Sequence, residues 1–283
     1  MKNFNKTIQM LIFDGDPNGH IMCELSNWNG RVYKIARNDL AKFEERNDAQ
    51  NTGVYFLFGK SIDGDDTVYI GEAEKIYTRL KQHLKDEIYW NDCITVVSKD
   101  NLLNKAHVKY LENNFYNLAI KANRATVINS TIPTCSSIAE FDLAMLEEFI
   151  ENTKLLVNSL GYKVFDSIEE NMKSKPDSSN YFYINAARGA VGRGLIVSDG
   201  FAVLKDSVIA NPVSVSMSSS LIKLREKLIN SGVIDGNYCF VKDYIFTSPS
   251  LAAAVVMGRN ANGRTEWKTK EHTTLKQMEE SKL

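Results

Sequence analysis

Apolar and polar residues alternate in three short stretches at the start of the chain, at residues 9–13, 20–25 and 31–35. A run rich in Asp, Pro, Asn and Gly separates the first two stretches. Alternation with a period of two is typical of a strand that buries one face, and Pro, Asn and Gly favour a tight turn. A short helix follows and ends near Arg46. The pattern predicts a β-rich N-terminal extension over residues 1–49.

The spacing of apolar positions changes repeatedly between residues 50 and 135. Short apolar runs between turn residues predict strands, and apolar positions three and four apart predict helices. The predicted strands are residues 53–58, 67–70, 94–97 and 125–128, and the predicted helices are residues 74–85 and a long helix ending near residue 122. This order predicts an α/β (α+β) domain over residues 50–135, with a small central β-sheet flanked by helices.

A second domain is predicted beyond a connecting segment. Residues 138–160 have the pattern of an acidic amphipathic helix, and the polar run 169–180 predicts a linker, so residues 136–180 are interpreted as helix and linker. The elements that follow predict a small α+β module over residues 181–270. They are strands at residues 181–185, 194–197, 201–204 and 238–246, and helices at residues 218–230 and 249–257.

Local signals define the last of these helices and the end of the chain. Ser248 suits the N-cap, Pro249 suits the first turn, and Gly258 suits the position just after the helix. Residues after about 269 are mostly polar and charged. They predict a flexible tail over residues 271–283.

The composition is that of a globular protein. Of 283 residues, 43% are hydrophobic and 24% are charged, which allows a core in each of two domains. The longest apolar run, residues 251–257, is too short to cross a bilayer, and the start lacks a signal-peptide pattern. Cysteines and histidines are dispersed without metal-ligand spacing. We expect a cytoplasmic protein without membrane contact and without structural zinc.

The distribution of charge limits where nucleic acid could bind. Residues 1–135 contain 17 basic and 17 acidic side chains, and residues 136–180 contain 4 and 9. Residues 181–283 contain 13 and 9, a net charge of +4. A phosphate-binding surface must therefore be local, or must lie in the last third of the chain.

Six polar residues in the predicted domain at residues 50–135 form a set with catalytic potential. They are Tyr55, Tyr69, Arg79, His83, Glu112 and Asn129. The tyrosines lie in adjacent predicted strands, and the arginine and histidine are four apart on one helix face. Each residue alone is more often structural, because a strand tyrosine packs in a core and a helix arginine or glutamate forms a solvated ion pair. Only the order of all six residues along the chain, taken together, indicates a catalytic site.

That order resembles the GIY-YIG nuclease family. Gly53-Val54-Tyr55 and Tyr69-Ile70-Gly71 are similar to its two defining triplets, with Val in place of the middle Ile of the first. The downstream residues match the family's remaining functional positions in order and spacing, namely Arg79, His83, Glu112 and Asn129. The resemblance covers roughly residues 50–135, so it implies a nuclease fold there.

The resemblance also implies roles. Glu112 would bind one Mg²⁺ or Mn²⁺, hard cations that suit a carboxylate, waters and a phosphate oxygen. Tyr55 would be the general base toward the attacking water, and His83 would accept or relay the phenolic proton. Because a free phenol has a pKa of about 10, this role needs nearby positive charge, which Arg79 and the metal would supply. Arg79 would also stabilise charge on the phosphate oxygens.

Two further positions complete the implied function. Tyr69 and Asn129 would orient the water, the phosphate or the metal shell. The implied protein is a metal-dependent endonuclease, acting on DNA in our interpretation, in restriction or phage defence. One active site per chain makes a homodimer attractive for double-strand cleavage.

A second pattern lies in the last third of the chain. Residues 246–254, together with Asn262-Gly263 and Trp267, resemble a domain of unknown function found behind GIY-YIG domains, and more loosely modules that accompany restriction and modification enzymes. Within residues 181–270 basic residues outnumber acidic ones 11 to 6. The candidate nucleic-acid-binding residues are Arg79, Arg188, Arg193, Arg259, Arg264 and Lys268.

Two alternatives to an active nuclease stay open. The first is a nucleic-acid-binding protein that uses a GIY-YIG scaffold without cutting, which the neutral balance of residues 1–135 favours. The second is a regulatory or toxin-like protein whose C-terminal module binds a protein partner. A nicking assay separates the first alternative from an endonuclease, and salt-dependent DNA binding by the C-terminal module tests the second.

Overall fold

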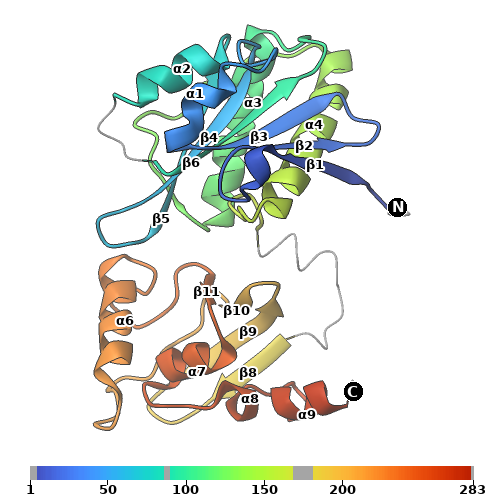
Figure 1. Cartoon of the computed structure of the whole chain (residues 1–283). Helices are drawn as coiled ribbons and strands as arrows, with labels where there is room; N and C mark the ends of the chain where they lie inside the picture. Colours follow the sequence, from blue (N-terminus) through green and yellow to red (C-terminus); the bar gives the residue numbers. More distant parts are fainter. Residues whose placement is uncertain (1–4, 86–89, 168–180, 282–283) are drawn as a thin grey trace. The chain divides into compact units, whose positions relative to one another are not determined.

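The chain has two compact units, seen in a computed structural model (Figure 1). The N-terminal unit is Met1–Ser167 and the C-terminal unit is Ile168–Leu283. The structure describes residues 5–85, 90–167 and 181–281, so the predicted linker at residues 169–180 lies outside the described residues. Each unit combines helices with a β-sheet, which confirms the predicted α+β class. Among the described residues, no helix has the length and apolarity needed to cross a membrane.

The N-terminal unit is built on a seven-stranded sheet with the order β1-β2-β3-β6-β4-β5-β7. Neighbouring strands are antiparallel, except that β7 is parallel to β5. The strands are β1 (Ile8–Ile12), β2 (Ile21–Leu25), β3 (Gly30–Ala36), β4 (Gly53–Lys60), β5 (Asp66–Ala73), β6 (Asp92–Ser98) and β7 (Thr126–Val127).

The strands that we expected as an N-terminal extension continue this sheet. β3 pairs with β6 from Gly30–Ser98 to Ala36–Asp92, so residues before 50 and after 90 share one ladder. Alternation along the sequence predicts each strand but not its partner, because strand pairing joins segments that are far apart in the chain.

Helices cover both faces of the sheet (Figure 1). On one face lie α1 (Leu40–Phe43), which follows the short helix η2 (Arg37–Asp39), and α2 (Ile76–His83). On the other face lie α3 (Lys105–Ala122) and α4 (Glu140–Ser159). The remaining short helix, η1 (Phe13–Gly15), connects β1 to β2.

Successive residues of β4 point to the two faces in turn. Val54 and Phe56 pack with Phe115 of α3, whereas Tyr55 and Leu57 lie in the cluster formed with α2. All five side chains are almost fully buried. Burying a large apolar side chain contributes about 1.5–3 kcal/mol, so both faces of this strand are needed for folding.

The C-terminal unit has a four-stranded antiparallel sheet with the order β11-β10-β9-β8. Its strands are β8 (Tyr181–Asn185), β9 (Val191–Val197), β10 (Gly200–Val203) and β11 (Tyr244–Phe246). Its helices are α6 (Ser219–Asn230), α7 (Pro249–Met257), α8 (Gly263–Glu266) and α9 (Leu275–Glu280). α7 packs on the face formed by Phe182, Phe201 and Phe246.

The local signals around α7 are confirmed. The Ser248 hydroxyl accepts a hydrogen bond from the Leu251 amide at 3.2 Å, Pro249 opens the helix, and Gly258 ends it with φ of 61°. The predicted strand at residues 238–246 is shorter than expected, since only β11 forms a ladder. Tyr238 has φ of 63°, a left-handed conformation that cannot continue a strand.

A helix, α9, lies within the range 271–283 where the sequence predicts a flexible tail; of that range the structure describes residues 271–281. α9 begins with a capping box between Thr274 and Gln277. The Leu275 amide donates to the Trp267 carbonyl at 3.0 Å, and the Leu275 side chain is buried in the core of the unit. Only Leu275 and Met278 attach this short, otherwise polar helix to the core, which explains why composition alone did not predict it.

Candidate active site

The register of β4 and β5 places two phenols on one face of the sheet. Tyr55 is opposite Gly71, and Leu57 is opposite Tyr69, so Tyr55 and Tyr69 point the same way. Their rings are stacked, with centroids 6.2 Å apart and an interplanar angle of 24°. The sequence predicted adjacent strands for the two tyrosines, and the register shows that both phenols lie on one surface of the sheet.

Gly71 makes room for the Tyr55 ring. A Cβ atom at this position would lie 2.4 Å from both Cζ and Oη of Tyr55, closer than real contacts allow. Only a glycine therefore lets the phenol cross the backbone of β5 here. Gly71, the last residue of the second triplet, therefore leaves the space that is filled by the ring of Tyr55, the last residue of the first triplet.

Residues of α2 contact the Tyr55 hydroxyl. Nε2 of His83 lies 2.8 Å from Oη of Tyr55, and Nε of Arg79 donates to the same oxygen at 3.3 Å. His83 is buried with only 3% of its surface exposed, and its ring packs against both tyrosines at centroid distances of 5.4 and 5.1 Å. The helical spacing of four residues brings the two α2 side chains to one hydroxyl.

The environment keeps Tyr55 protonated in the ligand-free protein. Burial raises the pKa of Tyr55 far above its ordinary value, Tyr69 adds to this, and the charge of Arg79 opposes it. Burial works to lower the pKa of Arg79, but the two phenols raise it on balance. Tyr55 therefore carries its proton in the ligand-free protein, and Nε2 of His83 is the nitrogen closest to its hydroxyl.

Glu112 belongs to the opposite helical layer. It lies on α3, half-buried, and burial raises its pKa to about 7. The charge of Glu72 on β5 raises this pKa further, whereas Lys105, Lys109 and Arg79 oppose the rise. The charge of Arg79 on α2 thus acts on Glu112, although α2 and α3 lie on opposite faces of the sheet.

Asn129 contacts the backbone of β5 rather than a side chain of the set. Its Oδ1 accepts from the Ile70 amide at 3.0 Å, and its Nδ2 donates to the Ile70 carbonyl at 2.7 Å. Ile70 stands between Tyr69 and Gly71. Asn129 therefore fixes the strand that supplies one phenol and the space for the other.

The donor set around Glu112 is compatible with a hard divalent cation. No group of three or more His, Cys, Asp or Glu side chains that could hold a metal occurs in the described parts of the chain. Mg²⁺, however, is commonly bound by one or two carboxylates, with waters and substrate phosphate completing its shell. Glu112 and its neighbour Glu72, which is paired with Lys105 at 2.8 Å, offer such carboxylates.

Several arginines expected to bind nucleic acid have partners within the C-terminal unit. Arg188 donates to the Met257 carbonyl at 3.2 Å, at the end of α7. Arg259 pairs with Glu266 at 2.6 Å, and Arg264 pairs with Glu279 at 2.7 Å. In contrast, two of the expected residues are exposed and have no ion pair with any described residue. They are Arg193 and Lys268.

Sequence reasoning missed two residues. Glu72 directly follows the second triplet, and the signal was its acidic charge one residue beyond Gly71. Arg225 is buried in α6 and donates to the carbonyls of Val255 and Ala210. An arginine on the apolar face of a predicted helix was the signal in that case.

The motif residues of the C-terminal unit are structural. A Cβ atom at Gly263 would lie 2.1 Å from the Pro249 carbonyl carbon, so only glycine allows α8 to approach the start of α7. The Trp267 ring is fully buried, and its Nε1 donates to the Pro249 carbonyl at 3.0 Å. These contacts explain the pattern without a ligand.

Comparison with known proteins finds one family. Residues 182–279 match the model of a domain of unknown function, DUF4357. This range covers nearly the whole described C-terminal unit, including all of α9 but its last residue. The first 181 residues match no GIY-YIG model, so the resemblance there stands on the motif residues alone. Neither a curated protein nor a solved structure matches the chain.

Proposed function

We propose that the N-terminal unit is a metal-dependent endonuclease of the GIY-YIG type, which hydrolyses phosphodiester bonds of DNA. The observation that supports this most is the convergence on one hydroxyl. Oη of Tyr55 lies 2.8 Å from Nε2 of His83 and 3.3 Å from Nε of Arg79. A packing tyrosine needs one polar partner, whereas this one has an imidazole nitrogen and a cation.

The contacts suggest a route for the proton. As the attacking water forms its bond to phosphorus, Oη of Tyr55 takes a proton from the water and passes its own proton to Nε2 of His83. The phenol stays neutral overall, so its raised pKa does not prevent the transfer. The leaving oxygen departs with the bonding electron pair and takes a proton from solvent. Arg79 would stabilise the negative charge that develops on the phosphate oxygens.

Glu112 would hold the metal. A bound Mg²⁺ or Mn²⁺ would act as a Lewis acid toward the phosphate. Glu112 has a pKa of about 7 in the ligand-free protein and is partly protonated near neutrality, so it would give up its proton on binding the cation. The phosphate would then lie at the sheet edge, between the phenols on one face and Glu112 on the other.

A nicking assay tests this proposal. Supercoiled plasmid is incubated with the full chain and Mg²⁺ or Mn²⁺, with Glu112→Gln and Tyr55→Phe variants alongside. We expect nicking by the wild type, none by Glu112→Gln, and none without metal. Nicking that is unchanged in both variants would contradict the proposal.

The non-catalytic alternative has one observation in its favour. The strongly raised pKa of Tyr55 disfavours the phenolate that a simple general base requires. Under this alternative the same residues would bind nucleic acid without cutting. Binding of DNA together with absence of nicking under all metal conditions would support it.

A further inference from the structure

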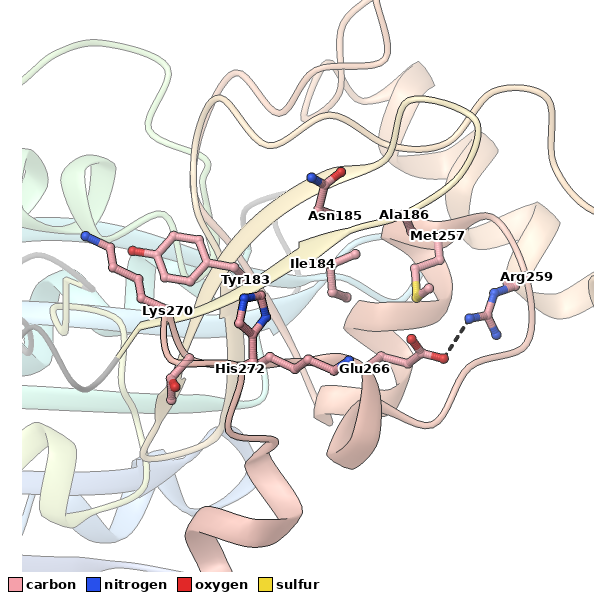
Figure 2. Close-up of a pocket in the computed structure, with 11 residues that line it drawn as sticks. Tyr183, Ile184, Asn185, Ala186, Met257, Arg259, Glu266, Lys270 and His272 are labelled. Carbon is pink, nitrogen blue, oxygen red and sulfur yellow. Dashed lines mark hydrogen bonds and ion pairs between the residues drawn. The ribbon is translucent and has the colours of Figure 1, made fainter.

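The C-terminal unit has a pocket beside its edge strand (Figure 2). Its volume is about 460 Å³. β8 forms one wall, and the segment after α8 forms the other. Tyr183 and Lys268 join the two walls through backbone hydrogen bonds of 2.7 and 3.1 Å. The pocket is therefore built on a fixed frame within one unit.

One side of the pocket is cationic. Lys268, Lys270 and His272 line it, and Figure 2 shows Lys270, His272 and the Tyr183 ring gathered on this side. Both lysines are exposed and have no ion pair with any described residue. Two free ammonium groups beside a phenol suit a phosphate group.

The other side of the pocket contains a paired cation and anion instead of unpaired lysines. Arg259 and Glu266 form an ion pair of 2.6 Å there, away from Lys270 in Figure 2. The pair offers both donors and a carboxylate acceptor at one edge of the pocket. Between the two sides, Ile184 and Met257 close the floor of the pocket, and both side chains are almost fully buried in the core of the unit. A flat group with polar edges would meet hydrogen-bonding partners at this edge of the pocket.

We propose that this pocket binds one nucleoside monophosphate unit. The phosphate would lie between Lys268 and Lys270, the base would lie against the half-buried ring of Tyr183, and the base edge would face Glu266. The volume is in the range of small-molecule sites, about 300–1,000 Å³, and is far larger than a phosphate ion needs. Tyr183 adds an aromatic surface of the kind on which bases stack.

The unit could belong to a nucleic-acid strand or be a free nucleotide. A strand would link the pocket to the proposed nuclease, and only that link rests on the proposed function. Binding in the pocket is measured without cleavage. Failure of the pocket and failure of the nuclease can therefore be told apart.

The first test removes the positive charges of Lys268 and Lys270. Binding of a fluorescein-labelled short oligothymidylate is followed by anisotropy over a salt series, in the full chain with Glu112→Gln. We expect Lys268→Gln with Lys270→Gln to weaken binding about tenfold or more and to flatten the log–log salt slope by about 0.7, the change for one phosphate contact on a single strand. The matched control replaces Lys223 and Lys276, two exposed lysines outside the pocket. Equal weakening by both pairs would overturn the proposal.

The second test fills the pocket without changing charge. Asn185 lines it and is exposed, so Asn185→Trp is expected to block the pocket and leave the fold intact. We expect the oligonucleotide affinity to fall about tenfold, as with the lysine pair. Unchanged affinity would mean that the lysines act only as a charged surface, which would overturn the proposal.

A competition experiment distinguishes a free nucleotide from one unit of a nucleic-acid strand as the ligand. Thymidine 5′-monophosphate and thymidine are added to the complex with the oligonucleotide. Displacement by the monophosphate, but not by thymidine, indicates that a free nucleotide suffices. If neither competes while both pocket variants weaken binding, the ligand is one unit of a strand. Displacement by inorganic phosphate at the same concentration as the monophosphate would contradict a role for the base.

Discussion

The side-chain amide of Asn129 forms both backbone hydrogen bonds of Ile70, accepting from its amide at 3.0 Å and donating to its carbonyl at 2.7 Å. β7 pairs with β5 only at Thr67 and Val68, and the Ile128 amide adds a bond to the Val68 carbonyl. The side chain of Asn129 therefore extends the ladder by one pair beyond the end of β7. The part of β5 that bears Tyr69 is held by this amide.

We expect Asn129→Ala to lower the free energy of unfolding by about 1–3 kcal/mol, because two backbone groups lose their partner. Cleavage should fall as well, since the strand that positions Tyr69 loosens. Urea denaturation measures the first effect and plasmid nicking the second. Asn117→Ala is the control, because Asn117 is exposed on α3 and bonds only to Asn113 among the described residues. A similar loss of stability in both variants would refute this account of Asn129.

Gly71→Ala should displace the Tyr55 ring. The added methyl would lie 2.4 Å from the phenolic oxygen, so Tyr55 must leave its position near His83. We expect a stability loss of about 1–3 kcal/mol from overpacking and a drop in turnover on the order of 10²-fold. Gly236→Ala is the control, because a Cβ atom there meets nothing within 4 Å. Full activity of Gly71→Ala would show that the ring position is not needed.

Tyr55→Phe should cut turnover by on the order of 10²-fold or more, the usual scale for a positioned proton-transfer group. DNA binding should barely change, because only a hydroxyl is removed. Stability should fall by about 1 kcal/mol, since buried His83 loses a partner at 2.8 Å. Single-turnover kinetics compares this variant with Tyr69→Phe. If Tyr69→Phe is far more damaging, the proton-transfer role belongs to Tyr69.

Glu112→Gln should remove cleavage, preserve DNA binding and change the pH dependence of stability. Because the pKa of Glu112 is raised to about 7, the folded state favours its protonated form. Stability from this group is full below its ordinary pKa of about 4.5 and is lost as the pH rises through about 7. Near pH 8 the Gln variant should therefore be more stable than the wild type, by about 1 kcal/mol after solvent screening, or about 2–4 °C in Tm.

Metal provides the complementary measurement. Mg²⁺ or Mn²⁺ near pH 8 should raise the Tm of the wild type, because binding to the folded state stabilises it. It should leave the Tm of Glu112→Gln unchanged. Thermal denaturation with and without metal checks both. Equal shifts in the two proteins would place the metal elsewhere.

A chain that ends near Lys175 should fold alone. The two hydrophobic clusters of the N-terminal unit contain no described residue beyond Ser167, and every proposed catalytic group lies within them or beside them. Its metal-dependent cleavage should persist. Its affinity for long DNA should fall, and the log–log salt slope should flatten by roughly 0.9 for each phosphate of duplex DNA that the shortened chain no longer neutralises. Salt titrations of the full and shortened chains, both with Glu112→Gln, measure this. Identical slopes would instead favour a protein partner for the C-terminal unit.

The sequence predicted correctly those features that depend on interactions between residues close together in the chain. The ends of α7 depend on Ser248, Pro249 and Gly258, which act within one turn of the helix, and their positions were predicted correctly. The shared face of Tyr55 and Tyr69 was predicted only in part, because it depends on the register between two strands. The two bonds from Asn129 to Ile70 span 59 positions, and no local pattern could indicate them.

Counting basic residues also cannot show which of them have partners elsewhere in the folded protein. The basic excess of the C-terminal unit suggested a surface for phosphate, yet Arg188 and Arg225 are used to satisfy carbonyls at the end of α7. An α-helix leaves its last four carbonyls without partners of its own. The amides of Gly258 and Ala210 bond the other two. Only tertiary structure reveals which cations remain for a ligand.

The position of the candidate site at the edge of a sheet affects how it can respond to a ligand. Tyr55 and Glu112 belong to helical layers on opposite faces, and β4 and β5 separate them. The separation of the two groups is therefore set by a hydrogen-bonded ladder. A site of this kind is preorganised, because binding requires little reordering of the groups that meet the ligand. Selectivity would then depend on whether a substrate can bend around the end of the sheet, rather than on closure of the protein over it.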